Sequence, residues 1–165
     1  MKIRLVLLSA DLLARLCEDP TAALRSIATV VPANIELLKL VAVMSRDCYQ
    51  RIGAQPPWTG YLALNEESNE VVGTCGFKGN PNPGGEVGIA YGTFKAFESC
   101  GVATAMARQL TALALRELVV RRVIAHTLPE RTASCRVLEK SGYKFVGEVI
   151  DPEDGKVWRW EYQGT

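Results

Sequence analysis

A strand–loop–helix–strand segment in the middle of the chain constrains its fold more than any other feature. Residues 86–93 and 122–128 are apolar runs bounded by turn residues, as strands are. Residues 102–118 between them carry apolar side chains at the spacing of a helix that buries one face. A helix that joins two strands of one sheet forms a right-handed crossover, and the two strands are then parallel. The segment therefore predicts a parallel strand pair packed against a helix.

The rest of the chain predicts hairpins and helices around that pair. Further strands are expected at residues 2–8, 58–65, 70–78, 143–150 and 157–162. Helix starts are expected at Ser9, Asp19-Pro20, Asn34 and Thr132, with Gly142 ending the last helix. Short polar turns join most of the strands, which favours antiparallel pairing outside the crossover. We expect one mixed α/β domain over residues 1–165, with a mostly antiparallel sheet of about seven strands and helices on both faces.

The charge and cysteine content exclude several classes of function. The formal net charge is +1, so no global field attracts nucleic acid. The five cysteines have no zinc-type spacing, so we expect no metal and reduced thiols. The apolar run that starts at Leu5 is cut by Asp11, too short for a signal peptide or a membrane span. We expect a cytoplasmic protein without a membrane or nucleic-acid partner.

The loop before the central helix has the composition of an anion site. Gly101 and Ala103 leave the backbone open at the start of the helix, where several N–H groups and the helix dipole point the same way. A phosphate group fits such a place. The same strand–turn–helix also occurs without any ligand, so the loop alone leaves both alternatives open.

A second segment at a set distance identifies a family. Residues 95–106 (KAFESCGVATAM) are similar to the pattern P-E-W/Y-Q/R-G-x-G-Y/V-A-T-E-A, and residues 129–143 (PERTASCRVLEKSGY) to P-x-N-x-x-S-x-x-V-L-E-K-x-G-F/Y. Both patterns are typical of the GNAT acetyltransferase superfamily, in the branch with the ribosomal-protein N-terminal acetyltransferases. The resemblance covers residues 58–162, whereas the first 50 residues match only in the order of their elements.

The resemblance implies acetyl-CoA as co-substrate and a mode of binding it. Backbone groups near Tyr91 and Thr93 would pair with the pantetheine amides of coenzyme A. The backbone amides of the loop would hold the pyrophosphate: Ser99, Cys100, Gly101, Val102 and Ala103. The parallel strands would splay apart, and the thioester would lie in the gap.

The resemblance also implies direct attack of an amine on the thioester, which requires a proton acceptor and a group beside the departing sulfur. Glu86 is the first candidate base, because it opens the strand that would bind the cofactor. His126, the only histidine, is the alternative base. Ser134 matches the family serine that hydrogen-bonds the sulfur. Leu138 stands where many relatives have a tyrosine acid, so that role is unassigned. A covalent cysteine route lacks a supporting motif.

Two positions depart from the family pattern. Glu98 replaces the usual Gln or Arg of the pyrophosphate loop, and Arg131 replaces the usual Asn before the second helix. A carboxylate repels a diphosphate, by roughly 1 kcal/mol or less when water screens it. We therefore expect Arg131 to supply positive charge to the cofactor or to pair with Glu98.

These observations predict an N-acetyltransferase that acts on a primary amine, either a small molecule or a protein N-terminus. A non-catalytic module that binds or senses acyl-CoA is the alternative, favoured by Glu98 and Leu138. Residues 10–60 would shape the acceptor side, and they carry no recognisable motif. A homodimer is considered only because two-fold dimers are the commonest assemblies.

Overall fold

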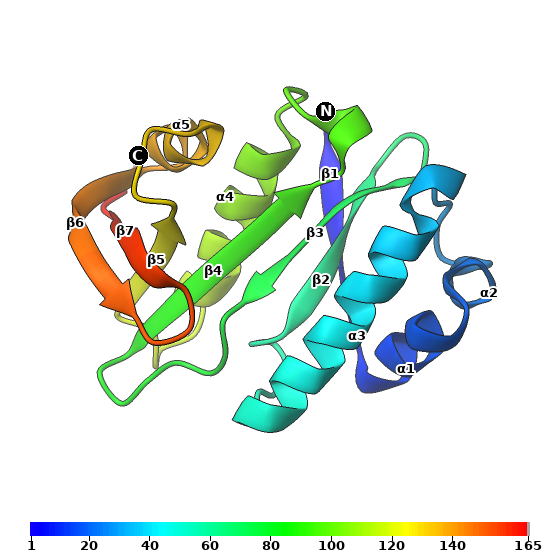
Figure 1. Ribbon diagram of the computed structural model, residues 1–165, viewed down its shortest axis with the longest axis horizontal. Coiled ribbons are helices and arrows are strands. Elements are labelled where there is room, and N and C mark those ends of the chain that lie inside the picture. Colours follow the sequence, from blue (N-terminus) through cyan, green and yellow to red (C-terminus); the bar gives the residue numbers. More distant parts are fainter. Residues whose placement is uncertain (165) are drawn as a thin grey trace.

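One sheet forms the centre of the molecule (Figure 1) in the computed structural model, which describes residues 1–164. Its strand order is β1-β2-β3-β4-β5-β7-β6. The strands are β1 (Ile3–Leu7), β2 (Gly60–Asn65), β3 (Val71–Phe77), β4 (Glu86–Thr93), β5 (Arg122–Thr127), β6 (Tyr143–Asp151) and β7 (Gly155–Tyr162). Among the described strands, neighbours pair antiparallel except β4 and β5, which are parallel. The predicted mixed sheet with one crossover is confirmed.

All four predicted helix starts are observed, and two of them have a side-chain cap bond. The helices are α1 (Ala10–Glu18), α2 (Pro20–Leu24), α3 (Ile35–Ile52), α4 (Val102–Leu115) and α5 (Ala133–Lys140), with short 3-10 turns η1 (Pro32–Asn34) and η2 (Lys95–Phe97). Ser9 caps α1 and Asp19 caps α2 through their side chains. Helix α3 begins directly after Asn34, as predicted, but the backbone of Asn34 is already in the helical region and its side chain makes no cap bond. Helix α4 also ends at Leu115, three residues earlier than predicted.

The sheet separates two hydrophobic cores. Leu62 and Leu64 of β2 pack with α1, α2 and α3, whereas Tyr61 and Ala63 of the same strand belong to the core beneath α4 and α5. This alternation is the ordinary consequence of a strand whose side chains point to opposite faces. Helices therefore cover both faces, as Figure 1 shows.

The parallel pair separates partway along its length. The register of β4 with β5 runs from Glu86 opposite Arg122 to Ile89 opposite Ala125. Strand β4 continues to Thr93, still paired with β3, and β5 continues to Thr127, still paired with β7. The two strands thus lose contact with each other while each keeps its outer neighbour. The predicted splay lies immediately beyond Ile89 and Ala125.

Residues 1–164 contain neither a membrane-spanning helix nor a cluster of metal ligands. No helix in this range is long and apolar enough to cross a membrane. The same residues contain no group of three or more His, Cys, Asp or Glu side chains arranged to hold a metal ion.

Candidate functional site

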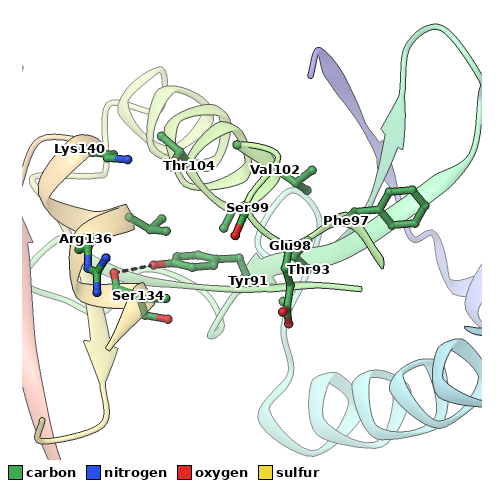
Figure 2. A pocket seen from close by; sticks show the side chains of 15 residues that line it. Tyr91, Thr93, Phe97, Glu98, Ser99, Val102, Thr104, Ser134, Arg136 and Lys140 are labelled. Carbon is green, nitrogen blue, oxygen red and sulfur yellow. Dashed lines mark hydrogen bonds between the residues drawn. The ribbon is translucent and has the colours of Figure 1, made fainter. Parts of the chain in front are cut away.

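A cavity of about 550 Å³ lies where the loop before α4 faces α5 (Figure 2). We call it the loop cavity. It is lined by Tyr91, Gly92, Thr93, Phe97, Glu98, Ser99, Gly101, Val102, Ala103, Thr104, Ala133, Ser134, Arg136, Val137 and Lys140. The two segments that carry the family patterns therefore form opposite walls of one cavity. Most of the predicted cofactor residues lie in these walls, while Cys100 and Arg131 do not.

The backbone of the loop is shaped for close approach of a ligand. Gly101 precedes α4 with φ of 81°, a left-handed conformation, and a Cβ there would meet no atom within 4 Å. Ser99 also has a positive φ, 61°, which is uncommon for a residue with a side chain. No described side chain caps α4, so the N–H groups of its first turn remain free to bind another acceptor. This arrangement suits a phosphate group.

Two basic side chains of α5 line the loop cavity. Arg136 and Lys140 line the wall opposite the loop, together with Ala133 and Val137 of the same helix face. The sequence prediction missed these two cations, although their i, i+4 spacing places them on one face of the predicted helix. They offset the carboxylate of Glu98, which also lines the cavity.

Arg131 does not take the predicted place. Its guanidinium binds both carboxylate oxygens of Glu139, at 2.7 and 3.2 Å, on the exposed surface of α5. It pairs neither with Glu98 nor with the walls of the loop cavity. The expectation of a pair between Arg131 and Glu98 is wrong, because Glu139 lies within reach along the same segment.

Strand β4 offers free backbone groups at the splay. Phe94 donates its N–H to Val72, and Gly88 accepts from Lys78, so even-numbered residues of β4 bond toward β3. Antiparallel pairing alternates, and the backbone groups of Tyr91 and Thr93 therefore point to the other side, where β5 has left. The hydroxyl of Thr93 is buried and has no hydrogen-bond partner within residues 1–164. These are the positions predicted to bind a pantetheine chain.

Helix α5 places Ser134 beside Tyr91. The Tyr91 hydroxyl donates to the backbone carbonyl of Ser134 at 3.5 Å, across the loop cavity (Figure 2). Burial raises the pKa of Tyr91 above its ordinary value, so the phenol stays protonated at neutral pH. Leu138 on the same helix is fully buried in the core. Its position therefore supplies packing and no acid.

Two further cavities follow along the other face of β4. The middle cavity, of about 300 Å³, shares Tyr91 and Gly92 with the loop cavity. The hairpin cavity, of about 790 Å³, lies between α3 and the β6–β7 hairpin and shares Ala90 and Tyr49 with the middle cavity. The middle cavity thus shares lining residues of β4 with each of the other two cavities. Neither Cys100 nor Cys135 lines any of them.

Tyr49 is a third residue whose place beside a cavity the sequence did not reveal. The helical pattern predicts it as an inward core residue of α3, but its ring lies between the middle and hairpin cavities. Its hydroxyl donates to the backbone carbonyl of Phe77 at 3.3 Å. Burial raises the pKa of Tyr49 to about 12, which keeps this hydroxyl a donor.

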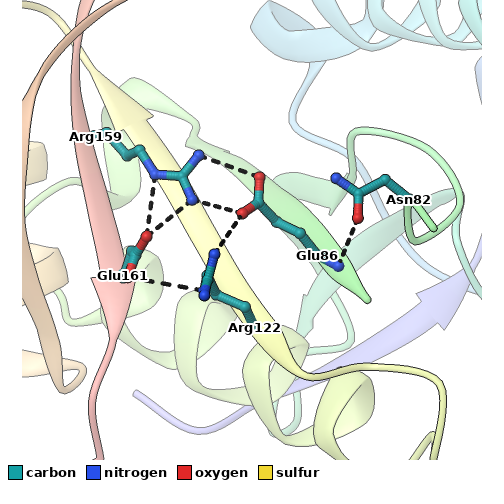
Figure 3. Close-up of polar contacts among 5 residues, drawn as sticks. All are labelled: Asn82, Glu86, Arg122, Arg159 and Glu161. Atoms are coloured by element: carbon teal, nitrogen blue, oxygen red, sulfur yellow. Dashed lines mark hydrogen bonds and ion pairs between the residues drawn. The ribbon is translucent and has the colours of Figure 1, made fainter. Parts of the chain in front are cut away.

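Glu86 lies at the far end of the hairpin cavity in a cluster of charges (Figure 3). Arg159 of β7 donates to both of its carboxylate oxygens, and Arg122 of β5 donates to one of them. Glu161 binds Arg159 from the other side. The hydrogen bonds from Arg159 lower the pKa of Glu86 below its usual range. The predicted base is therefore an ionised group already neutralised by two arginines.

His126 lines the same cavity without such partners. Its side chain is 14% exposed, and both ring nitrogens are buried with no hydrogen bond to any residue from 1 to 164. Asp151 of β6 lies 3.6 Å from Nδ1. Burial lowers the pKa of His126, and the positive charge of Lys78 adds to this effect. The imidazole is neutral at neutral pH.

Comparison with protein families and sequences places this site in a known context. A family model described as "Acetyltransferase (GNAT) domain" matches residues 3–144. The N-acetyltransferase YjdG of Bacillus subtilis (strain 168), described as uncharacterized, is 26% identical over 102 residues, which is 62% of this chain and 58% of that relative. The match thus spans somewhat more than half of the relative's length.

Solved structures show the same fold at low identity. The aminoglycoside acetyltransferase AAC(6')-Ib, solved with coenzyme A and kanamycin, is 19% identical with a TM-score of 0.66, over 97% of this chain and 94% of its own. The ribosomal L7/L12 alpha-N-protein acetyltransferase RimL, solved with coenzyme A, is 17% identical with a TM-score of 0.65, over 98% and 93%. The predicted fold is confirmed.

Proposed function

The chain belongs to the GNAT acetyltransferase domain family, and from this premise we propose that it transfers an acetyl group from acetyl-CoA to a primary amine. The amine attacks the thioester directly while both substrates are bound. One observation carries the proposal. A cavity shaped for a phosphate-bearing cofactor and a separate cavity large enough for an acceptor lie along β4, and the middle cavity shares lining residues with both.

The loop cavity is the proposed site of coenzyme A. The amides of Ser99 through Ala103 would hold the pyrophosphate, and Arg136 and Lys140 would balance its charge. The free backbone groups of Tyr91 and Thr93 would pair with the pantetheine amides. The residues present fit this cofactor, because an uncapped helix start and two cations face the same space. Cys100 does not line the cavity, so it would contribute to this site only through its backbone amide.

Residues around the splay would support the transfer. Ser134 is proposed to hydrogen-bond the sulfur, because it lies on the first turn of α5 beside Tyr91. Glu86 and His126 are the two candidates for the proton acceptor, and both line the hairpin cavity. Holding amine and thioester in attack geometry supplies a large part of the rate, on the order of 7–11 kcal/mol in favourable cases.

The hairpin cavity is the proposed acceptor site. The structural relatives described above are named for aminoglycoside and protein N-terminal acceptors, which are primary amines. A module that binds acyl-CoA without turnover is the competing function. The buried Leu138 favours it, because the position lacks the acid that many relatives use.

Two measurements separate these functions. Titration calorimetry with coenzyme A tests the loop cavity, and we expect micromolar affinity. Thiol release from acetyl-CoA, followed with a chromogenic disulfide in the presence of a panel of amines, tests transfer. Amine-dependent thiol release supports the acetyltransferase. Binding of coenzyme A with no release above the rate without enzyme, for every amine of the panel, supports the non-catalytic module.

A further inference from the structure

The position of His126 relative to the splay distinguishes it from Glu86. Ala125 is the last residue of β5 opposite β4, where it faces Ile89, so His126 is the first residue beyond the separation. It is level with Ala90, which lines both the middle and the hairpin cavity. Glu86 lies four residues earlier on β4, about 13 Å along the strand. His126 is therefore beside the connection between the cavities, and Glu86 is remote from it.

The imidazole also has no structural role that would explain its polarity. Buried polar groups in proteins almost always have hydrogen-bond partners, and each exception needs a reason. Both nitrogens of His126 lack one among the described residues, while the ring lines the hairpin cavity. A substrate group bound in the hairpin cavity could supply the missing hydrogen-bond partner of the His126 ring.

The charges around His126 come from three strands and from two loops. They are Lys78 after β3, Glu86 on β4, Asp151 at the end of β6, Glu153 and Asp154 in the β6–β7 turn, and Arg159 on β7. Lys78 and Arg159 disfavour a protonated imidazole, whereas Asp151 and Asp154 favour it. Asp154 is bound by Lys78 at 3.0 Å. Asp151 is therefore the carboxylate best placed to stabilise a proton on His126.

We propose that His126 is the catalytic base and that Asp151 positions it. The inference rests on the proposed acetyl transfer. The lone pair of the amine forms the C–N bond with the thioester carbonyl carbon, and one proton of that nitrogen passes to a ring nitrogen of His126. The C–S bond then breaks, and the thiolate leaves with the electron pair. A proton from His126 or solvent completes the free thiol, so the products are the amide and coenzyme A.

The first test compares His126→Gln with Glu86→Gln. We expect His126→Gln to lower kcat about 100-fold, in the range typical of a general base. A neutral imidazole is required, so wild-type kcat falls as pH drops below the pKa of His126, and His126→Gln lacks this acid limb. Glu86→Gln is expected to keep the acid limb of the pH profile and to lose less activity than His126→Gln. A larger loss in Glu86→Gln, or an unchanged acid limb in His126→Gln, overturns the proposal.

Chemical rescue separates a base from a packing residue. His126→Ala leaves space beside the hairpin cavity, and added imidazole is expected to restore part of its activity. Asp151→Asn is expected to shift the acid limb to lower pH, because a protonated His126 loses its nearby negative charge. Unchanged coenzyme A affinity in each variant shows that the fold is intact. Failure of imidazole at any concentration to raise the rate of a folded His126→Ala counts against the proposal.

A nuclear magnetic resonance measurement tests the contact without turnover. Because the chain has a single histidine, its Cε1–H resonance needs no assignment. We expect this resonance to shift when phenethylamine is added to the protein with coenzyme A bound. If the His126 resonance shifts but no amine gives thiol release, the contact between His126 and the amine is supported and the acetyltransferase function is not. Thiol release with no shift overturns the role of His126.

A separate observation concerns the walls of the hairpin cavity. Its lining is largely apolar, with Met44, Ile52, Phe77, Ile124, Val149 and Ile150 contributing to it. Met44 and Ile150 are exposed to solvent at its rim. Exposed apolar side chains that gather around one cavity are typical of a surface that binds an apolar group.

The carboxylates of the same cavity are mostly engaged. Glu86 is held by two arginines, and Glu153 is bound by Arg51 of α3 at 3.0 Å. Asp151 accepts two backbone N–H groups of its own turn. An acceptor with several positive charges would have to break these interactions, whereas a single amine needs only the space beside His126.

We infer that the acceptor is a monoamine on an apolar body, such as an arylalkylamine, and this too rests on the proposed function. We expect kcat/KM to be at least tenfold higher for phenethylamine than for spermidine or kanamycin. Ile150→Asp, at the rim, is expected to lower the ratio of kcat/KM for phenethylamine to kcat/KM for spermidine or kanamycin. A higher kcat/KM for spermidine or kanamycin overturns the inference while supporting acetyl transfer. Absence of thiol release with all three overturns this inference, whereas its absence with every amine of the panel defeats the acetyltransferase function itself.

Discussion

Arg159 holds the carboxylate of Glu86 by both oxygens, with Nη1 3.1 Å from Oε1, and the two side chains are only 21% and 20% exposed. This pair joins β7 to the start of β4 across β5, with Arg122 and Glu161 completing the cluster (Figure 3). Charge-assisted bonds of this kind are among the stronger ones in proteins. The arrangement gives Glu86 a structural role at the edge where the parallel pair begins.

Glu86→Gln is therefore expected to destabilise the fold at neutral pH, by about 1–2 kcal/mol. The lowered pKa of Glu86 means that its stabilising contribution is present above the unfolded-state pKa of about 4.3 and is lost as pH falls through the folded-state pKa. Urea unfolding at a series of pH values measures both effects. The difference between wild type and variant should shrink in acid. Equal midpoints at neutral pH would contradict the assignment.

Arg136→Ala and Lys140→Ala are each expected to weaken coenzyme A binding about fivefold, which corresponds to about 1 kcal/mol for a partly exposed cation near a phosphate. The effect should diminish in high salt. Arg131→Ala is the matched control, because its guanidinium pairs with Glu139 outside the cavity, and a smaller change is expected. Calorimetry at two salt concentrations decides the matter. A larger effect of Arg131 would restore its predicted role.

Gly101→Ala tests the loop itself. The left-handed backbone at Gly101 makes any Cβ unfavourable by about 1–2 kcal/mol, and the added methyl enters the open space of the loop cavity. Both stability and coenzyme A affinity should fall. Gly155→Ala is a matched control in the β6–β7 turn, with φ of 73° and equally open space. It should lose similar stability and keep its affinity. Equal coenzyme A affinities of Gly101→Ala and Gly155→Ala would contradict the placement of Gly101 in the cofactor site.

Ser134→Ala tests the proposed contact with the sulfur. We expect kcat to fall about tenfold, since a hydrogen bond to the departing thiolate forms fully only as the C–S bond breaks. Affinity for coenzyme A should change little. Thr132→Ala, two residues earlier and outside the loop cavity, is the comparison. Steady-state kinetics with saturating amine measure the difference. Equal kcat in the two variants would show that Ser134 acts only in the local structure of α5.

Much of the fold followed from patterns that are local in the chain. The hairpins and the caps at Ser9 and Asp19 depend on residues a few positions apart, and the crossover follows from the order of contiguous elements, both of which sequence patterns report. Asn34 precedes α3 as predicted but makes no side-chain cap bond, because Pro32 starts a 3-10 turn that carries the backbone into the helical region. Local propensity did not reveal that this turn would precede the helix.

The candidate site also has one part that the sequence predicts and another part that only the tertiary structure decides. The loop at residues 98–103 and the segment at 129–143 were predicted as partners from their resemblance and spacing, and the structure places them on opposite walls of one cavity. The sequence by itself determined the strand–loop–helix unit, because the strand, the loop and the helix start are contiguous. Tertiary structure decided which side chains face the cavities. Arg136 replaced Arg131 beside the loop, and Glu86 received two arginine partners that lie 36 and 73 positions further along the chain. Such pairings depend on strand order and register across β5 and β7, which no local pattern encodes.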